Sequence, residues 1–144
     1  LRSLDAKRAD LPEIFATCQT ISNHLPDLHS TVGILNDALF QTMKPNATFI
    51  NTGRGAQVVE EDLVRALQEE PSRIAILDVT HPEPPREDSP LYTMKNVILT
   101  PHSAGSSGHE VRRMGETMCK EFEHRLLGES TSNEVTMAML ETMA

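Results

Sequence analysis

The sequence is poor in aromatic residues and in cysteine. It has no tryptophan, one tyrosine and four phenylalanines, so aromatic residues make up 3% of the 144 positions. A buried core would therefore consist mainly of aliphatic side chains and methionine. The two cysteines, Cys18 and Cys119, lie far apart and form no CxxC pair. This spacing argues against a zinc site, so we expect no metal and two buried, reduced thiols.

Long apolar runs and clusters of positive charge are also missing. No stretch approaches the roughly 20 apolar residues that cross a bilayer, and no apolar run follows residues 1–5 as it would in a signal peptide. We therefore expect a cytoplasmic protein without a membrane partner. The net charge is −8 and the basic residues are scattered. This argues against nucleic acid as a partner, because phosphates are bound by clustered Lys and Arg.

The sequence does contain alternating helical and strand-like segments. A β-prone stretch is predicted at residues 18–23, and short apolar strands are predicted at residues 47–50, 74–79 and 96–100. Helices are predicted at residues 11–16, from about 36, at 60–68, and in a longer segment capped by Ser106 and Ser107. Apolar strands that alternate with helices predict an α/β fold, in which a parallel sheet is covered by helices on both faces.

The longest predicted helix carries a regular apolar stripe. The members of the stripe share one helical face and are Val111, Met114, Met118, Phe122 and Leu126. We expect this stripe to pack in the core and Gly128 to end the helix. Residues 129–144 are polar and then rich in methionine. They form a separate tail, either a short docking helix or a frayed end.

Polar side chains follow three of the predicted strands. Arg54 lies after the second strand, Asp78 and Glu83 at the end of the third, and His102 just beyond the fourth. Ligands bind beyond the carboxyl ends of the strands in open parallel sheets, so these side chains are expected to converge. A carboxylate stabilises a cationic His as a proton donor, and an Arg matches a carboxylate substrate. The set fits oxidation or reduction next to a carboxylate.

Four stretches resemble the D-isomer-specific 2-hydroxyacid dehydrogenases. They occur in this order: SNHLPDLHSTVGILND, MKPNATFINTGRGAQVVEEDLVRAL, AILDVTHPEPPREDSPLY and NVILTPHSAG. The resemblance implies that residues 1–128 are the C-terminal portion of an NAD-binding domain, with a partial Rossmann-like (doubly wound) parallel sheet flanked by helices. It also implies NAD as cofactor, with NADP as the open alternative, and a small 2-hydroxy or 2-keto acid as substrate.

The resemblance assigns roles to single residues. In this family the match to Arg54 binds the substrate carboxylate and keto oxygen, the match to Glu83 supports the catalytic His, and the match to His102 is the acid/base. Asp78 matches an acid that contacts the nicotinamide carboxamide. The positions assigned to the cofactor are Leu25, Thr52, Gly53, Arg54, Asp78, His102, Ala104 and Gly105.

The sequence also departs from the family's pattern. Asp27 and Leu28 stand where Leu-Thr is usual, Gly53 stands where Ala is usual, and the GxGxxG turn does not occur. Because that turn holds the pyrophosphate at a helix terminus, we expect the isolated chain to bind NAD weakly or not at all. Dimers are common in the family, which makes a homodimer of the full-length protein a further expectation. The alternative function is a non-catalytic, dinucleotide-sensing or corepressor-like module on the same fold.

Overall fold

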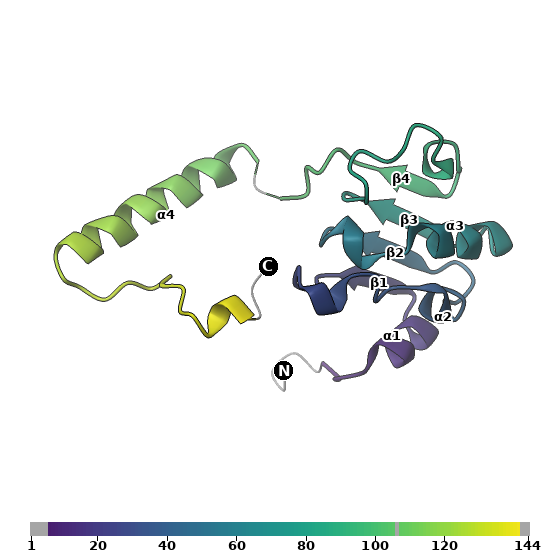
Figure 1. The fold of residues 1–144 in the computed structure, drawn as a ribbon, viewed down its shortest axis with the longest axis horizontal. Helices are drawn as coiled ribbons and strands as arrows, with labels where there is room; N and C mark the ends of the chain where they lie inside the picture. The colour runs from purple at the N-terminus through teal and green to yellow at the C-terminus, as the bar shows by residue number, and fades with distance from the viewer. Residues whose placement is uncertain (1–5, 106, 142–144) are drawn as a thin grey trace.

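The fold is built on a four-stranded parallel sheet. A computed structural model describes residues 6–105 and 107–141. The strands lie in chain order (Figure 1) and are β1 (Thr20–Asn23), β2 (Thr48–Asn51), β3 (Ile74–Leu77) and β4 (Val97–Leu99). In register, Asn23 pairs with Asn51, Asn51 with Leu77, and Leu77 with Leu99. The carboxyl ends of all four strands therefore reach the same edge of the sheet.

Three short helices pack with the sheet and begin where the sequence favours a helix start. α1 (Leu11–Thr17) follows Asp10, whose side chain accepts a hydrogen bond from the Glu13 N–H at 2.9 Å. α2 (Asp37–Phe40) is capped in the same way by Asn36. α3 (Glu60–Glu69) has an acidic first turn, which suits the positive end of the helix dipole. The predicted helices and strands before residue 105 are confirmed, and every end that was predicted lies within two residues of the observed one. The second helix was predicted only from its start near residue 36, and it ends at Phe40.

The core lies on one face of the sheet. Side chains alternate along the strands, so that Ile21, Phe49 and Ala75 are buried while their neighbours lie on a more exposed face. Phe49 also belongs to a cluster with Phe15 and Phe40, whose ring centroids are 5.2 to 6.2 Å apart. The scarce aromatic residues are thus concentrated where α1 and α2 meet the sheet.

The α/β class is confirmed, but helices cover only one face of the sheet within the described residues. On the other face, Ile98 is 52% exposed and Ile74 is 38% exposed. Each connection leads to the next strand on the same side of the previous one. Because crossovers between parallel strands are right-handed, connections that all move in one direction place their helices on the same face of the sheet. The expectation of helices on both faces is therefore wrong for this part of the chain, which holds one winding direction of a doubly wound sheet.

The last helix, α4 (His109–Leu126), lies apart from the sheet (Figure 1) and buries none of its residues. Gly128 follows its last turn with a φ of +72°, as predicted. The residues of the apolar stripe are between 52% and 70% exposed: Val111, Met114, Met118, Phe122 and Leu126. The expectation that this stripe packs in the core is wrong, because a helical apolar pattern does not supply the surface that would cover it.

Two smaller expectations also need correction. The N-cap residue of α4 is Gly108 rather than Ser107, and Ser106 lies outside the described residues. The two cysteines are free thiols, but Cys119 on α4 is exposed and Cys18 is only half-buried.

Candidate active site

Arg54, Glu83 and His102 lie in three loops at the carboxyl edge of the sheet. They follow β2, β3 and β4 respectively. The first two loops touch at Gly55, where a Cβ atom would lie 2.0 Å from the carbonyl group of Thr80. Only glycine permits this approach. The loop that carries Arg54 is therefore packed directly against the loop that leads to Glu83.

Glu83 and His102 form a hydrogen-bonded pair across two loops. The distance between Glu83 Oε1 and His102 Nδ1 is 2.5 Å, and both side chains are a little under half exposed. The backbone N–H of Thr80 donates to the second carboxylate oxygen at 3.4 Å. A carboxylate in its ionised form only accepts, so with Glu83 ionised the shared proton would be on Nδ1, and Nε2 would be left to exchange a proton with a ligand. The structure thus brings these two residues together, and their catalytic roles stay predictions.

Asp78 is buried and holds the turn that carries His102. Its Oδ1 accepts from the Ser103 N–H at 2.8 Å and from the Thr100 hydroxyl, and its Oδ2 accepts from the Ala104 N–H at 2.9 Å. Burial would raise the pKa of Asp78, but these hydrogen bonds and the nearby His102 hold the pKa below its ordinary value. His102 has a φ of +53°, which is costly for a residue with a Cβ atom. The bonds from Asp78 stabilise that turn.

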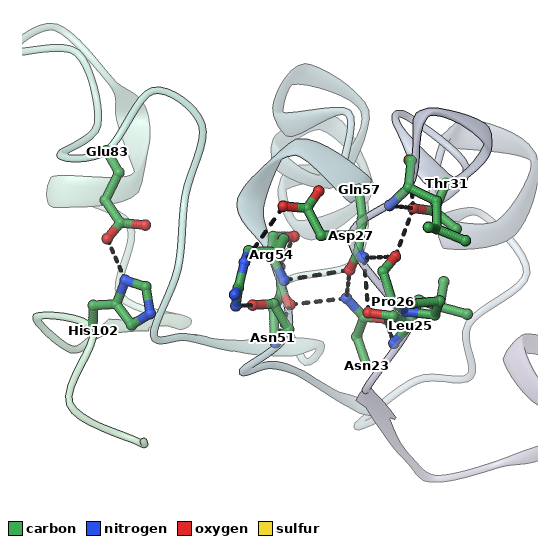
Figure 2. Close-up of polar contacts among 12 residues, drawn as sticks. Asn23, Leu25, Pro26, Asp27, Thr31, Asn51, Arg54, Gln57, Glu83 and His102 are labelled. Atoms are coloured by element: carbon green, nitrogen blue, oxygen red, sulfur yellow. Dashed lines mark hydrogen bonds and ion pairs between the residues drawn. The ribbon is translucent and has the colours of Figure 1, made fainter. Parts of the chain in front are cut away.

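Arg54 is half-exposed at its side chain. Its guanidinium donates to the Gly53 carbonyl at 2.9 Å and forms an ion pair with Asp27, with 3.6 Å between Nε and Oδ2. Figure 2 shows the guanidinium on the side of its loop that faces the Glu83–His102 pair. Within the described residues, no hydrogen bond or ion pair joins Arg54 to that pair. Arg54 is therefore a separate cationic group on the same edge.

A pocket of about 520 Å³ lies between the loops after β3 and β4. Its polar wall includes Asp78, Glu83 and His102, and its apolar wall includes Tyr92 and Leu99. A mostly apolar hollow with a few convergent polar groups is typical of a small-molecule site. The acid/base candidate thus faces a space that a small ligand can enter.

Sequence reasoning missed three buried amides beside Arg54. Asn23, Asn51 and Gln57 are 5%, 1% and 1% exposed. The side-chain N–H₂ of Asn23 donates to Asn51 Oδ1 at 2.9 Å and to Gln57 Oε1 at 2.6 Å (Figure 2). The available signal was an Asn at the end of two apolar strands, Asn23 and Asn51, which are paired in register. Nothing in the local sequence marks Gln57.

The residues expected to contact a cofactor form two groups on this edge. One group surrounds the turn of His102 and consists of Asp78, Ala104 and Gly105. The other lies on the Arg54 side and consists of Leu25, Thr52 and Gly53. Asp78 Oδ2 accepts from Ala104, and a carboxylate oxygen can take a second donor such as a nicotinamide carboxamide. This acceptor fits the nicotinamide end of a dinucleotide, whereas the GxGxxG turn for the pyrophosphate is not in this sequence. The individual contacts stay predictions.

Two other kinds of feature were sought in the part of the chain that the structure describes. No three or more His, Cys, Asp and Glu side chains gather there as the ligands of a metal ion would. No helix there combines the length and the apolarity needed to cross a membrane.

Comparison with known proteins agrees with this geometry. A sequence model of the family "D-isomer specific 2-hydroxyacid dehydrogenase, NAD binding domain" matches residues 1–104. D-3-phosphoglycerate dehydrogenase of Rattus norvegicus is 37% identical over 138 residues, which are 96% of this chain and 26% of that protein. The match therefore includes α4 and most of the tail.

Solved structures of the same family share the fold. A D-isomer specific 2-hydroxyacid dehydrogenase from Xanthobacter autotrophicus Py2, in complex with NADPH and MES, has a TM-score of 0.77 at 31% identity, covering 90% of this chain and 41% of that one. D-lactate dehydrogenase with NAD+ from Lactobacillus jensenii has a TM-score of 0.76 at 31% identity, covering 89% and 42%. The chain thus spans less than half the length of each relative. By sequence and by fold, it belongs to the D-isomer-specific 2-hydroxyacid dehydrogenase family, as part of the NAD-binding domain.

Proposed function

We propose that the natural protein carrying this chain interconverts small D-2-hydroxy acids and 2-keto acids by hydride transfer with NAD(H) or NADP(H). The observation that carries the proposal is the Glu83–His102 pair at 2.5 Å, on the same sheet edge as Arg54. An acid/base and a cation for a carboxylate are the two groups that a 2-keto acid requires. The contacts proposed for the dinucleotide are those of Asp78 and of the backbone on both sides of the site.

Reduction of a 2-keto acid adds a hydride at C2 and a proton at the carbonyl oxygen. The bound dinucleotide supplies the hydride. Protonated His102 gives its Nε2 proton to that oxygen as the carbon–oxygen double bond becomes single, and the product is a 2-hydroxy acid. Glu83 accepts at Nδ1, so it orients the ring and stabilises the cationic imidazole before the transfer. Oxidation follows the same steps in reverse.

Arg54 provides the second contact with the substrate. A guanidinium can bind both oxygens of a carboxylate through two parallel N–H groups. This fixes the direction in which C2 and its oxygen face His102. Asp27 is paired with Arg54 at 3.6 Å. The substrate carboxylate therefore replaces Asp27 or shares the guanidinium with it.

The test is oxidation of NADH and of NADPH by the natural protein with glyoxylate, hydroxypyruvate and other small 2-keto acids. His102→Ala should lower kcat/KM by about 10²–10⁴-fold, the usual contribution of a general acid, and Arg54→Ala should raise KM. The matched control is His124→Ala, because His124 is a half-exposed histidine on α4. A fully active His102→Ala variant contradicts the proposal. Dinucleotide binding without turnover would favour the alternative function, a dinucleotide-sensing module. The cytoplasmic location and the homodimer remain predictions.

A further inference from the structure

Gln57 is a buried amide whose two N–H groups both face backbone carbonyls. It ends the short 3-10 turn Gly55–Gln57 that follows Arg54, and it is 1% exposed. Its Nε2 donates to the Leu25 carbonyl at 2.9 Å and to the Pro26 carbonyl at 2.8 Å. These carbonyls belong to the loop after β1. A single side chain therefore ties the loop after β2 to the loop after β1.

The oxygen of the same amide faces Arg54. Gln57 Oε1 accepts from the Arg54 backbone N–H at 3.3 Å and from Asn23 Nδ2 at 2.6 Å. The Arg54 carbonyl in turn accepts from Asn51 Nδ2 at 3.2 Å. Both backbone polar groups of Arg54 are thus held by buried amides (Figure 2). Buried amides with all their partners satisfied define position well, because any displacement leaves a polar group unpaired.

Gly53 provides an independent indication that this packing is tight. A Cβ atom at position 53 would lie 3.0 Å from both Asn23 Nδ2 and Gln57 Oε1. A glycine at this position leaves space for the two amides. Gly53 N–H also donates to Asn51 Oδ1 at 3.1 Å. The residue before Arg54 is therefore part of the same arrangement.

The contact that the Arg54 side chain makes with Asp27 depends on the same buried amides. It is 47% exposed, and its ion-pair partner Asp27 directly follows Pro26, one of the two residues whose carbonyls Gln57 binds. An exposed ion pair at 3.6 Å contributes little stability of its own. The guanidinium also donates to the Gly53 carbonyl at 2.9 Å. Its two contacts therefore lie on the two loops that Gln57 joins, the loop of Gly53 and the loop of Asp27.

We propose that Gln57 is a positioning residue for Arg54. It joins the loop of Arg54 to the segment of Leu25, Pro26 and Asp27, so that the guanidinium presents its two N–H groups toward the carboxylate of a 2-keto acid. This inference rests on the proposed function of Arg54. It adds a residue that does not touch the substrate but sets the affinity for it.

The first test is Gln57→Met in the natural protein, which keeps the volume and removes both the donors and the acceptor. We expect KM for the 2-keto acid to rise about tenfold with kcat within about threefold, because small misplacements of a substrate-positioning group weaken productive binding. The matched control is Asn96→Leu. Asn96 also donates to two carbonyls, those of Leu67 at 3.0 Å and Arg73 at 2.9 Å, but it precedes β4 at the opposite edge of the sheet. This control should lower Tm while KM stays within about twofold of wild type.

The second test is Gln57→Glu, which separates hydrogen bonding from packing. A protonated Glu can still accept from Arg54 and donate to one carbonyl, whereas the ionised form has no donor. The ratio of its KM to that of the wild type should therefore be smallest at acidic pH and rise with pH. For Gln57→Met the same ratio should stay flat. Dividing by the wild-type value removes the pH dependence that His102 itself contributes.

The outcomes distinguish this inference from the proposed function. Suppose that the wild type is active but Gln57→Met leaves KM within twofold of the wild-type value, or that Asn96→Leu raises KM as much as Gln57→Met does. The inference about Gln57 then fails, while the proposed function stands. If the wild type turns over no 2-keto acid, the proposed function fails. In that case a titration of oxalate, followed through the Arg54 Nε–H NMR signal, decides the inference. An unchanged dissociation constant in Gln57→Met, or no shift in the wild type, overturns it.

Discussion

The sheet unit, residues 6–105, and the segment that contains α4, residues 107–141, differ in how they use their apolar side chains. α3 and α4 both have an apolar face. In α3, Leu63 and Leu67 are each 1% exposed, whereas in α4, Phe122 is 63% exposed. Figure 1 shows the reason, because α3 lies against the strands and α4 stands away from them.

This difference shows that the topology of the strands decides which helix is buried. The connections of the four strands all turn in one direction, which brings α2 and α3 to the same face as α1. The buried core on that face contains no residue of α4. The amphipathic pattern of a helix therefore predicts that it has a face to bury, but the rest of the fold determines whether that face is buried.

The sharpest test of the comparison is the same substitution in both regions. Phe49→Ala removes a ring that is 0% exposed and packs against Phe15 and Phe40. It should lower the free energy of unfolding by about 3–5 kcal/mol, since it leaves a cavity in a closed core. Phe122→Ala in α4 should change it by less than about 0.5 kcal/mol. Urea unfolding of the 144-residue chain measures both. A similar loss for the two variants would mean that α4 packs against the sheet unit in solution.

A buried arginine provides the next largest contrast. Arg73 is 7% exposed, and its guanidinium donates to the carbonyls of Gln41, Met43 and Ala66. Arg73→Ala leaves these buried carbonyls without a donor and should cost about 2–4 kcal/mol of unfolding free energy. The control is Arg113→Ala, which breaks an exposed pair with Glu110 on α4 and should have little measurable effect. Equal losses from the two variants would contradict the comparison.

The fold of the sheet unit could be predicted because its signals are local. Asp10 and Pro12 mark the start of α1 within one turn, β2, β3 and β4 are short apolar runs, and β1 is a β-prone stretch that contains Thr20 and Ile21. Such signals depend on residues that are neighbours in the chain. The exposure of α4 depends instead on which surfaces other elements leave uncovered, and that information is spread over the whole chain.

The candidate site divides in the same way. Glu83 and His102 could be found because a parallel sheet brings all its carboxyl ends to one edge. Gln57 could not, because most of its partners lie about 30 positions earlier in the chain, in residues 23–26, and are defined by distances of about 3 Å between backbone and side-chain atoms. The partnership of Asp27 with Arg54 was likewise invisible, although Asp27 stood out as a departure from the family's pattern. The strand-end rule selects candidate residues on one edge of the sheet but does not reveal how those residues are held.

A substitution at Asp78 probes the C-terminal end of the sheet unit. Asp78 accepts hydrogen bonds from the N–H groups of Ser103 and Ala104, which lie just before the segment that contains α4. The pKa of Asp78 is lowered in the folded chain. Its ionised form therefore adds stability above the unfolded-state pKa of about 3.9, and this contribution is lost as the pH falls through the lower folded-state value. Asp78→Asn should be less stable than wild type at neutral pH, and the difference should shrink in acid.

Two measurements check the prediction for Asp78. Urea unfolding at neutral and acidic pH gives the difference in stability, and hydrogen exchange should show faster exchange of the Ser103 and Ala104 amides in the variant. The control is Asp88→Asn, because the side chain of Asp88 is 83% exposed. A stability difference that stays constant from neutral to acidic pH would show that the charge of Asp78 does not hold this turn.

The smallest expected effect is a difference between the reaction rates of the two cysteine thiols, and it does not involve stability. Cys119 lies on the exposed helix α4, whereas Cys18 is half-buried and packs against the core. Iodoacetamide should modify Cys119 about tenfold faster than Cys18 in the folded chain, because access to the thiol limits the reaction. The two rates should converge in urea, where both thiols are equally accessible. Equal rates in the folded chain would mean either that another surface covers Cys119 on α4 or that Cys18 is more accessible than the structure shows. Either explanation would weaken the distinction between the sheet unit and α4. A clear difference in rate would show that the two regions differ in solution in how accessible their side chains are.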